Sequence, residues 1–231
     1  MAPKSLIFVR HAQSLGNIMT QDQRAECEIP NHSYPITSHG EHEAFYVALH
    51  LGKTVGDKLP DLYFQSTFLR TQTTMSIIQQ GLEGLGVRNI QPVVTDSRLD
   101  EKWDGIFHEL SKTDIEKYYP EQVRLRKRQG YYHYRAPNGE SCPDVEVRIR
   151  SFISDSSIDG KNILLVGHGR WFLILQKILH SLSVEQFLEL KKAGLENCSI
   201  VEYDFGSIQL SPSQAIVPWK GHLSEEDTEL A

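Results

Sequence analysis

Two short apolar runs in the chain each lead into a histidine. The run LIFV is followed directly by Arg10 and His11, and the run ILLV is followed by Gly167 and His168. Imidazole can act as a nucleophile, an acid or a base near neutral pH, and a guanidinium can bind two oxygens of an anion at once. Histidines flanked by arginine therefore favour chemistry on a phosphoryl group.

Two further polar residues stand where a strand has just ended. Arg70 lies in the first turns of a predicted helix that follows a strand, and Glu101 follows another strand at 92–96. Taken alone, such an arginine or acid is usually solvated, and a lone histidine usually packs or caps locally. Together, however, the histidines, arginines and carboxylate supply forked donors, a nucleophile and a proton donor, which is what phosphoryl transfer needs.

These side chains need a scaffold whose strands end at one edge. LIFV and ILLV are rich in branched apolar residues, which is typical of strands buried on both faces at the centre of a parallel sheet. Strand-like and helical segments alternate, with strands at 61–66, 92–96 and 199–205 and helices beginning near residues 38, 66, 141 and 171. The pattern predicts an α/β fold, a single-domain three-layer sandwich with a mostly parallel central sheet and helices on both faces. Ligands bind such sheets outside the carboxyl ends of the strands.

The domain boundaries follow from length and composition. The 231 residues are 39% hydrophobic and 23% charged, which suffices for one full core. We predict one domain over residues 1–210, followed by an acidic C-terminal tail at 211–231. The helix that begins near Ser66 is predicted to fade at Gly81, with GLEGLG (81–86) forming a loop.

The composition also limits which binding partners and which cellular compartment we expect. The net charge of −6 and pI near 5.9 argue against binding to nucleic acid or an anionic membrane. The three cysteines form no CxxC pair, and the ten histidines form no HxxxH or HExxH pair, so we expect neither a disulfide framework nor a metal site. No apolar run approaches 18 residues and no signal-peptide pattern is present. We expect a soluble cytoplasmic protein.

The chain resembles the histidine phosphatase superfamily, the phosphoglycerate-mutase-like proteins, in the branch with a short core. The matching motifs occur in the family's order: RHAQSLGN at 10–17, STFLRTQTT at 66–74, LDE at 99–101, PNGES at 137–141 and GHG at 167–169. Two departures follow the first histidine, where Ala12 replaces the usual Gly and Gln13 replaces the usual Glu. Ala12 is compatible with a negative φ, and the loss of the Glu leaves open how His11 is oriented.

The resemblance implies a covalent mechanism without metal or cofactor, acting on a small phosphorylated substrate. His11 would be the nucleophile and Glu101 the proton donor and acceptor. His168 would be the third catalytic residue, and it would surround the phosphoryl oxygens together with the phosphate-binding residues Arg10, Asn17, Arg70 and Gly169.

Three functions fit this set of residues. A phosphomonoester phosphatase is favoured because the segment between Glu101 and Pro137 is short compared with the lid of the family's mutases. The alternatives are a phosphoglycerate mutase, and a catalytically silent phosphate-binding module.

Three other signals carry weaker predictions. The Cys142-x5-Arg148 spacing is better explained as part of a helix than as a phosphatase loop. The basic run at 124–128 fits a solvated helix face better than a site for an acidic substrate tail. The aromatic cluster YYHY at 131–134 fits packing beneath a lid better than stacking on a substrate ring.

Overall fold

A five-stranded sheet forms the centre of the molecule. The computed structural model describes residues 2–54, 59–206 and 215–219. The strands are β1 (Ser5–Arg10), β2 (Leu62–Gln65), β3 (Val93–Thr95), β4 (Asn162–Gly167) and β5 (Ile200–Asp204). They lie in the order β3-β2-β4-β1-β5, and all neighbours are parallel except β5, which runs antiparallel to β1. The predicted mostly parallel sheet is therefore confirmed.

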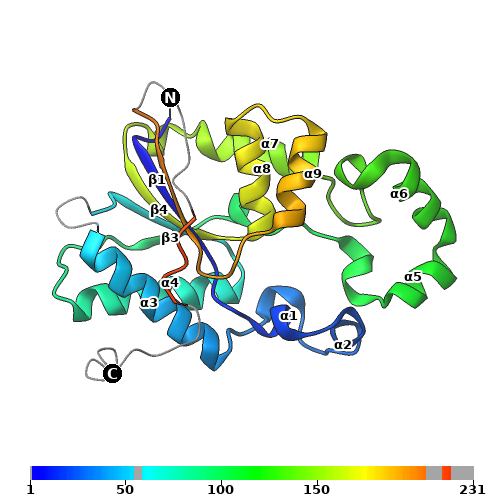
Figure 1. Cartoon of the computed structure of the whole chain (residues 1–231), viewed down its shortest axis with the longest axis horizontal. Helices are drawn as coiled ribbons and strands as arrows, with labels where there is room; N and C mark the ends of the chain where they lie inside the picture. The colour runs from blue at the N-terminus through cyan, green and yellow to red at the C-terminus, as the bar shows by residue number, and fades with distance from the viewer. Residues whose placement is uncertain (1, 55–58, 207–214, 220–231) are drawn as a thin grey trace.

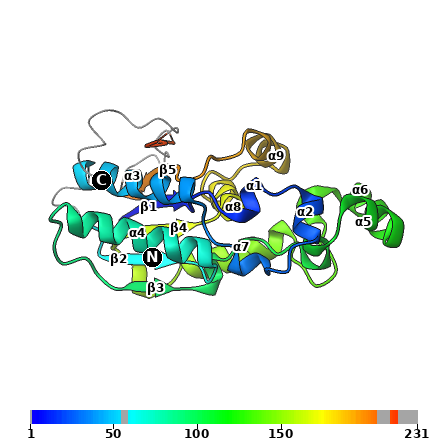
Figure 2. The same ribbon diagram turned by 90° about the horizontal axis from the view of Figure 1, so that it is seen from below.

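Helices cover both faces of the sheet (Figures 1 and 2). One face packs against α3 (Ser38–Thr54) and α4 (Leu69–Gly84), and the other packs against α7 (Cys142–Ile153), α8 (Gly169–Leu179) and α9 (Val184–Ala193). Neighbouring residues of β1 point to opposite layers, since Phe8 packs with α8 whereas Val9 packs with α3 and α4. This two-sided burial is why the strand is apolar throughout. The three-layer sandwich is confirmed.

The remaining α-helices lie beyond the carboxyl ends of the parallel strands. They are α1 (Leu15–Ile18), α2 (Gln21–Ala25), α5 (Lys112–Tyr118) and α6 (Pro120–His133), with 3-10 turns η1 (Asn31–Ser33), η2 (Ser97–Leu99) and η3 (Gly105–Glu109). The turn η4 (Ser156–Ile158) instead precedes β4, at the amino end of that strand. In Figures 1 and 2, α5 and α6 project away from the sheet as a separate lobe. Gly130, at φ 75°, bends the chain near the end of α6.

Two helix ends differ from the predictions. The helix that was expected to fade at Gly81 continues to Gly84 as α4. Gly81 is needed there for packing, because a Cβ on it would lie 2.5 Å from the Ala48 methyl of α3. Close helix contact thus outweighs the low helix propensity of glycine. The helix expected to reach Leu182 ends at Leu179, since Ser181 has a φ of 51°.

Part of the predicted C-terminal tail is described. Ile216 forms an isolated antiparallel bridge with Ile200, and the Trp219 ring stacks on Tyr46 of α3 with centroids 5.6 Å apart. The rest of the predicted tail lies outside the described residues. No helix among those described is both long and apolar enough to cross a membrane.

Candidate active site

The two histidines leave neighbouring strands at the same edge of the sheet. β1 and β4 pair in parallel with Arg10 opposite Gly167, so His11 and His168 follow side by side. Their ring centroids are 5.2 Å apart. The sequence predicts the two histidines at the ends of two strands, and the strand order brings them together.

The buried His11 ring is held in one orientation by its own loop. Its Nδ1 lies 2.8 Å from the Ala12 carbonyl oxygen. Burial, followed by the charges of Arg70 and Arg10, holds the pKa of His11 well below its usual range, so the ring is neutral at neutral pH. Because a carbonyl only accepts, Nδ1 carries the proton and Nε2 keeps a free electron pair. The Ala12 carbonyl therefore fixes the orientation of the His11 ring, which the replacement of the usual Glu by Gln13 had left open.

His168 is fully buried, and its two ring nitrogens have different partners. Nδ1 lies 3.4 Å from Nη2 of Arg70, which can only donate, so Nδ1 accepts. Nε2 lies 2.8 Å from the Ser66 hydroxyl oxygen and donates to it. Burial and the nearby Arg70 keep the pKa of His168 well below its usual range. His168 is thus a neutral ring that anchors an arginine.

The predicted phosphate-binding arginines reach the site from β1 and α4. Arg70 donates to the Asn31 carbonyl at 2.9 Å, and its guanidinium lies 4.5 Å from the centroid of the Phe68 ring. Burial lowers the pKa of Arg70 to about 10, which still leaves it charged at neutral pH. Arg10 donates from Nη1 to the Leu195 carbonyl. Its buried Nε has no hydrogen-bond partner among the described residues and would lie 3.5 Å from a Cβ on Gly169, at the start of α8.

The loop after His11 is fixed from two sides. The Ala12 N–H donates to the Thr74 hydroxyl at 3.0 Å, and the Gln13 N–H donates to Glu43 Oε2 at 2.7 Å. Ala12 does not belong to the residues with positive φ, so the alanine fits without strain. Asn17 Oδ1 accepts from the Ser14 N–H and hydroxyl, both at 2.9 Å, which leaves the Asn17 amide N–H groups for a ligand.

Glu101 is held by a neighbouring backbone group and by an arginine. Its Oε1 accepts from the Lys102 N–H at 2.8 Å and lies 3.5 Å from Arg170 Nε. Asp100 instead accepts from the N–H and the hydroxyl of Thr67, and it does not line the cavity that His11 lines. Asp104 pairs with Arg170 and Lys102, which together lower the pKa of its carboxyl to about 2 against the opposing effect of burial.

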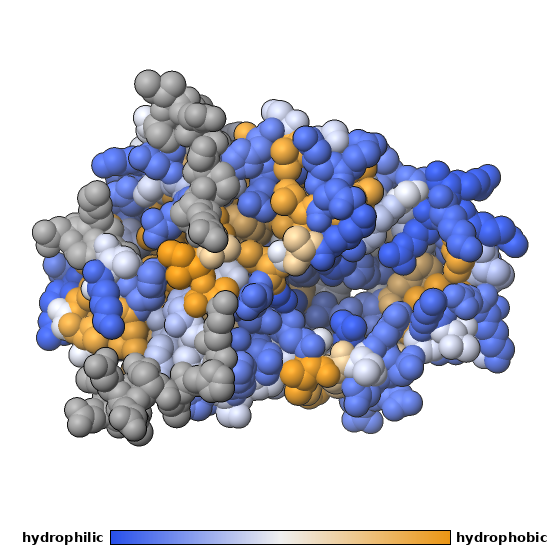
Figure 3. Space-filling model, in the orientation of Figure 1, coloured by the Kyte–Doolittle hydropathy of each residue, from blue (hydrophilic) through white to orange (hydrophobic). Residues whose placement is uncertain are grey.

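These groups surround a polar cavity of about 140 Å³. Five of the seven predicted residues line it: Arg10, His11, Asn17, Arg70 and Glu101. His168 lies beside it, in contact with Arg70, and Gly169 lies beside Arg10. Figure 3 shows this face hollowed between the body and the lobe of α5 and α6, with mainly hydrophilic residues around the hollow. The chemical roles of the seven residues stay predictions.

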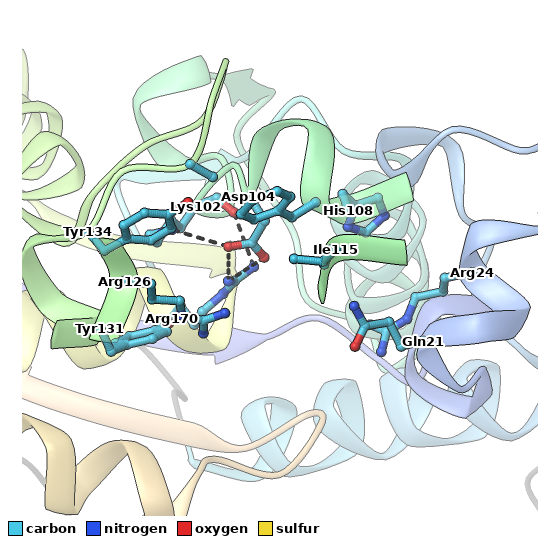
Figure 4. A pocket seen from close by; sticks show the side chains of 12 residues that line it. Gln21, Arg24, Lys102, Asp104, His108, Ile115, Arg126, Tyr131, Tyr134 and Arg170 are labelled. Carbon is cyan, nitrogen blue, oxygen red and sulfur yellow. Dashed lines mark hydrogen bonds and ion pairs between the residues drawn. The ribbon is translucent and has the colours of Figure 1, made fainter. Parts of the chain in front are cut away.

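A second cavity of about 220 Å³ adjoins the first. The two share four lining residues: Arg24, Asp104, His108 and Arg170. Figure 4 shows the second cavity between α2, which carries Arg24, and the end of α6, which carries Tyr131. Arg126 of the basic run also lines it, so one member of the run that was predicted to be a solvated helix face borders the cavity.

The comparisons with known proteins agree with this geometry. The sequence profile of the histidine phosphatase superfamily (branch 1) matches residues 6–212. The chain belongs to this superfamily. It is 26% identical over 227 residues to the phosphoglycerate mutase-like protein AT74H of Arabidopsis thaliana, covering 90% of this chain and 76% of that one. It is 29% identical to the 2,3-bisphosphoglycerate-dependent phosphoglycerate mutase of Nitrobacter winogradskyi, covering 81% of this chain and 86% of that one.

Solved structures of the family share the fold. The α-ribazole phosphatase of Shigella flexneri superposes with a TM-score of 0.73 at 19% identity, covering 95% of this chain and 100% of that one. A mycobacterial glucosyl-3-phosphoglycerate phosphatase in complex with VO3 superposes with a TM-score of 0.64 at 24% identity, covering 91% of this chain and 97% of that one. These likenesses establish the architecture.

Several residues of the site were not predicted. Ser66 and Thr74 begin and end the motif STFLRTQTT, and their hydrogen bonds to His168 and Ala12 explain why a hydroxyl stands at each position. Glu43, Arg24 and His108 come from segments whose sequence resembles ordinary surface helix or loop. Only the folded chain brings them to the histidines.

Proposed function

We propose that the protein is a phosphomonoester hydrolase that acts through a phosphohistidine on His11. The observation that carries the proposal is the state of His11: neutral, buried, with Nδ1 bound to a carbonyl and Nε2 left as a nucleophile beside two guanidinium groups. A neutral imidazole is the form that can attack phosphorus.

In the first step, His11 Nε2 attacks phosphorus and the bond between phosphorus and the leaving oxygen breaks. Glu101, a carboxylate beside Arg170 in the free enzyme, takes up a proton when the substrate phosphate binds and gives that proton to the leaving oxygen, so the alcohol departs neutral. Arg10 and Arg70 bind the oxygens of the phosphoryl group, where negative charge spreads as it is transferred in line. Asn17 and the start of α8 at Gly169 add neutral donors.

In the second step, a water oxygen attacks the phosphorus of the phosphohistidine and the N–P bond breaks. Glu101, now a carboxylate, takes a proton from that water, and inorganic phosphate leaves. The dianionic phosphate also favours a proton on His168, whose Nδ1 could then donate instead of accept. In this mechanism the guanidinium groups neutralise the phosphate charge without a metal ion.

A second candidate is a phosphoglycerate mutase, which the likeness to the Nitrobacter winogradskyi enzyme favours. In that reaction the phosphohistidine passes its phosphoryl group to a sugar-acid hydroxyl instead of to water. The hydrolase is preferred because the cavity that Glu101 lines joins a larger one, which leaves room for water to enter once the alcohol has departed.

Two measurements test the proposal. Phosphate release from p-nitrophenyl phosphate and from a panel of phosphorylated metabolites is measured alongside isomerisation of 3-phosphoglycerate. Acid quenching during turnover should trap an acid-labile phosphoenzyme in the wild type and none in His11→Ala. Isomerisation much faster than phosphate release would identify a mutase. The absence of both reactions and of the phosphoenzyme would identify a silent binding module.

A further inference from the structure

The second cavity gives the leaving group of a substrate a defined place to lie. It shares Arg24, Asp104, His108 and Arg170 with the first cavity, where the phosphoryl group is proposed to bind, so one ligand can occupy both. It is also the larger of the two, at about 220 Å³ against about 140 Å³. What it would accept depends on the charges and surfaces that remain available in it.

Two of its four cations are already neutralised. Lys102 Nζ lies 3.2 Å from Asp104 Oδ1, and Arg170 Nη1 lies 2.7 Å from Asp104 Oδ2. Arg170 Nε also lies 3.5 Å from Glu101 Oε1. Two carboxylates thus balance two cations in this part of the wall, as the dashed lines of Figure 4 show for Asp104.

The other two cations, Arg24 and Arg126, have no carboxylate within ion-pair distance in the described part of the chain. Arg24 is half-buried and donates from Nε to the Thr20 carbonyl of its own turn at 3.4 Å. Arg126 is exposed at the cavity mouth, with its guanidinium 5.8 Å from the centroid of the Tyr131 ring. They come from α2 and α6, on different sides of the cavity (Figure 4). Unneutralised cations that border one cavity from two sides attract an anion.

The remaining wall combines one unused polar atom with aromatic surface. His108 Nε2 is buried and has no hydrogen-bond partner among the described residues. Phe107, Ile115, Tyr131 and Tyr134 supply the apolar lining. Such a wall suits a leaving group with an apolar or ring-shaped body and a polar substituent.

We propose that the preferred substrate is a phosphomonoester whose leaving group carries a second anionic group, bound between Arg24 and Arg126 and within reach of His108. The proposal rests on the hydrolase function above and names its substrate class. Arg24 and Arg126 are the specificity residues, whereas Asp104 prevents Lys102 and Arg170 from adding to the anion site.

The test uses two pairs of substrates that differ mainly in one charge. The first pair is 4-carboxyphenyl phosphate and 4-carbamoylphenyl phosphate, and the second is 3-phosphoglycerate and glycerol 3-phosphate. For each pair, the ratio of the kcat/KM values for phosphate release gives the preference for the anionic member. Comparing this ratio between variants cancels the intrinsic difference between the leaving groups.

Arg24→Gln should reduce the preference about tenfold or more, since it removes a half-buried, charge-assisted hydrogen bond. Arg126→Gln should reduce it about two- to fivefold, because an exposed charge contributes less. Both effects should appear mainly in KM. Arg124→Gln is the matched control: the same substitution on the same helix, at a residue that borders an exposed hollow outside the cavity. It should leave the ratio unchanged.

Two outcomes would overturn the proposal. One is a wild-type enzyme that prefers the neutral member of both pairs or shows no preference in either. The other is an equal change of the ratio in Arg24→Gln and Arg124→Gln. In both cases, continued hydrolysis of p-nitrophenyl phosphate with an acid-labile phosphoenzyme would show that the hydrolase function stands and only the substrate class is wrong.

Discussion

Ser66→Ala is expected to destabilise the protein more than its small size suggests. The Ser66 hydroxyl is fully buried, accepts from His168 Nε2 at 2.8 Å and from the Phe68 N–H at 3.2 Å, and lies 2.8 Å from the Thr71 hydroxyl. Alanine would leave two buried donors without an acceptor. Each such donor costs about 1–3 kcal/mol. Since the backbone around Phe68 can relax, we expect a total loss of about 2–4 kcal/mol.

The loss is measured by urea unfolding, where the midpoint should fall and the slope should stay unchanged. In a thermal scan, about 2–4 kcal/mol corresponds to a decrease in Tm of about 4–16 °C for a chain of this size. Ser76→Ala provides the control, because Ser76 is exposed on α4, the helix that follows Ser66, and its hydroxyl only accepts from Gln80. We expect its effect to stay within about 0.5 kcal/mol.

The same variant should affect turnover through His168. Without Ser66, the ring is free to change its tautomer and orientation, and Arg70 loses a fixed neighbour. A misplaced phosphate-binding group can lower the rate by about tenfold or more. If the free energy of unfolding of Ser66→Ala lies within about 0.5 kcal/mol of the wild-type value, the buried His168 N–H does not depend on the Ser66 hydroxyl, and this prediction is wrong.

The remaining predictions concern the chemistry and its pH dependence. Glu101→Gln should slow alkyl phosphates about 10²–10⁴-fold, whereas the burst of His11 phosphorylation by p-nitrophenyl phosphate should stay nearly normal, because nitrophenolate leaves without a proton. Equal losses of rate for both substrates would show that Glu101 has a structural role, and Asp104 would then be tested as the proton donor. EDTA should leave activity unchanged, and a loss that Mg²⁺ or Zn²⁺ restores would contradict the metal-free mechanism. The pKa values of His11, His168 and His108 all lie below their usual value of about 6.5. Below that pH the unfolded chain binds more protons than the native one. The contribution of these neutral histidines to the free energy of unfolding should therefore be complete above about pH 6.5 and should decrease as the pH falls toward 5. Urea unfolding at several pH values would show this decrease.

The sheet was readable from the sequence because its central strands are buried on both faces. LIFV and ILLV could be recognised as buried strands from their own residues, without knowledge of the strands that pair with them. The residues that follow them were expected at one edge of the sheet from the geometry of parallel strands alone. Helix ends were less readable. Gly81 resembles a helix terminator until Ala48 of another helix is known to lie against it, and no pattern local to Gly81 contains that information.

The second cavity was harder to predict from the sequence for a similar reason. Arg126 belongs to a run of five mostly basic residues, and which of them borders a cavity depends on the position of α6 relative to α2. Arg170 was visible as the residue after Gly169, but its neutralisation by Asp104 and Glu101 joins segments more than 60 residues apart. Spacing along the chain predicts residues on one element, whereas pairing between elements is decided by packing.

The position of β1 in the sheet sets the order in which the chain can fold. β1 lies between β4 and β5, so its partners begin at Asn162 and end at Asp204. During synthesis the apolar segment LIFV must therefore wait for almost the whole domain before it can pair. Contacts this distant in sequence slow folding and prolong the exposure of an unpaired strand to aggregation.

The proposed nucleophile, His11, reaches its final surroundings late for the same reason. His168 and Arg70 lie beside it only after β4 has paired with β1 and α4 has packed on the sheet. We expect fragments that stop before β4 to lack the phosphate site altogether, however well their helices form. In a refolding experiment, recovery of phosphohistidine formation should follow the formation of long-range strand pairs and lag behind the recovery of helical circular dichroism.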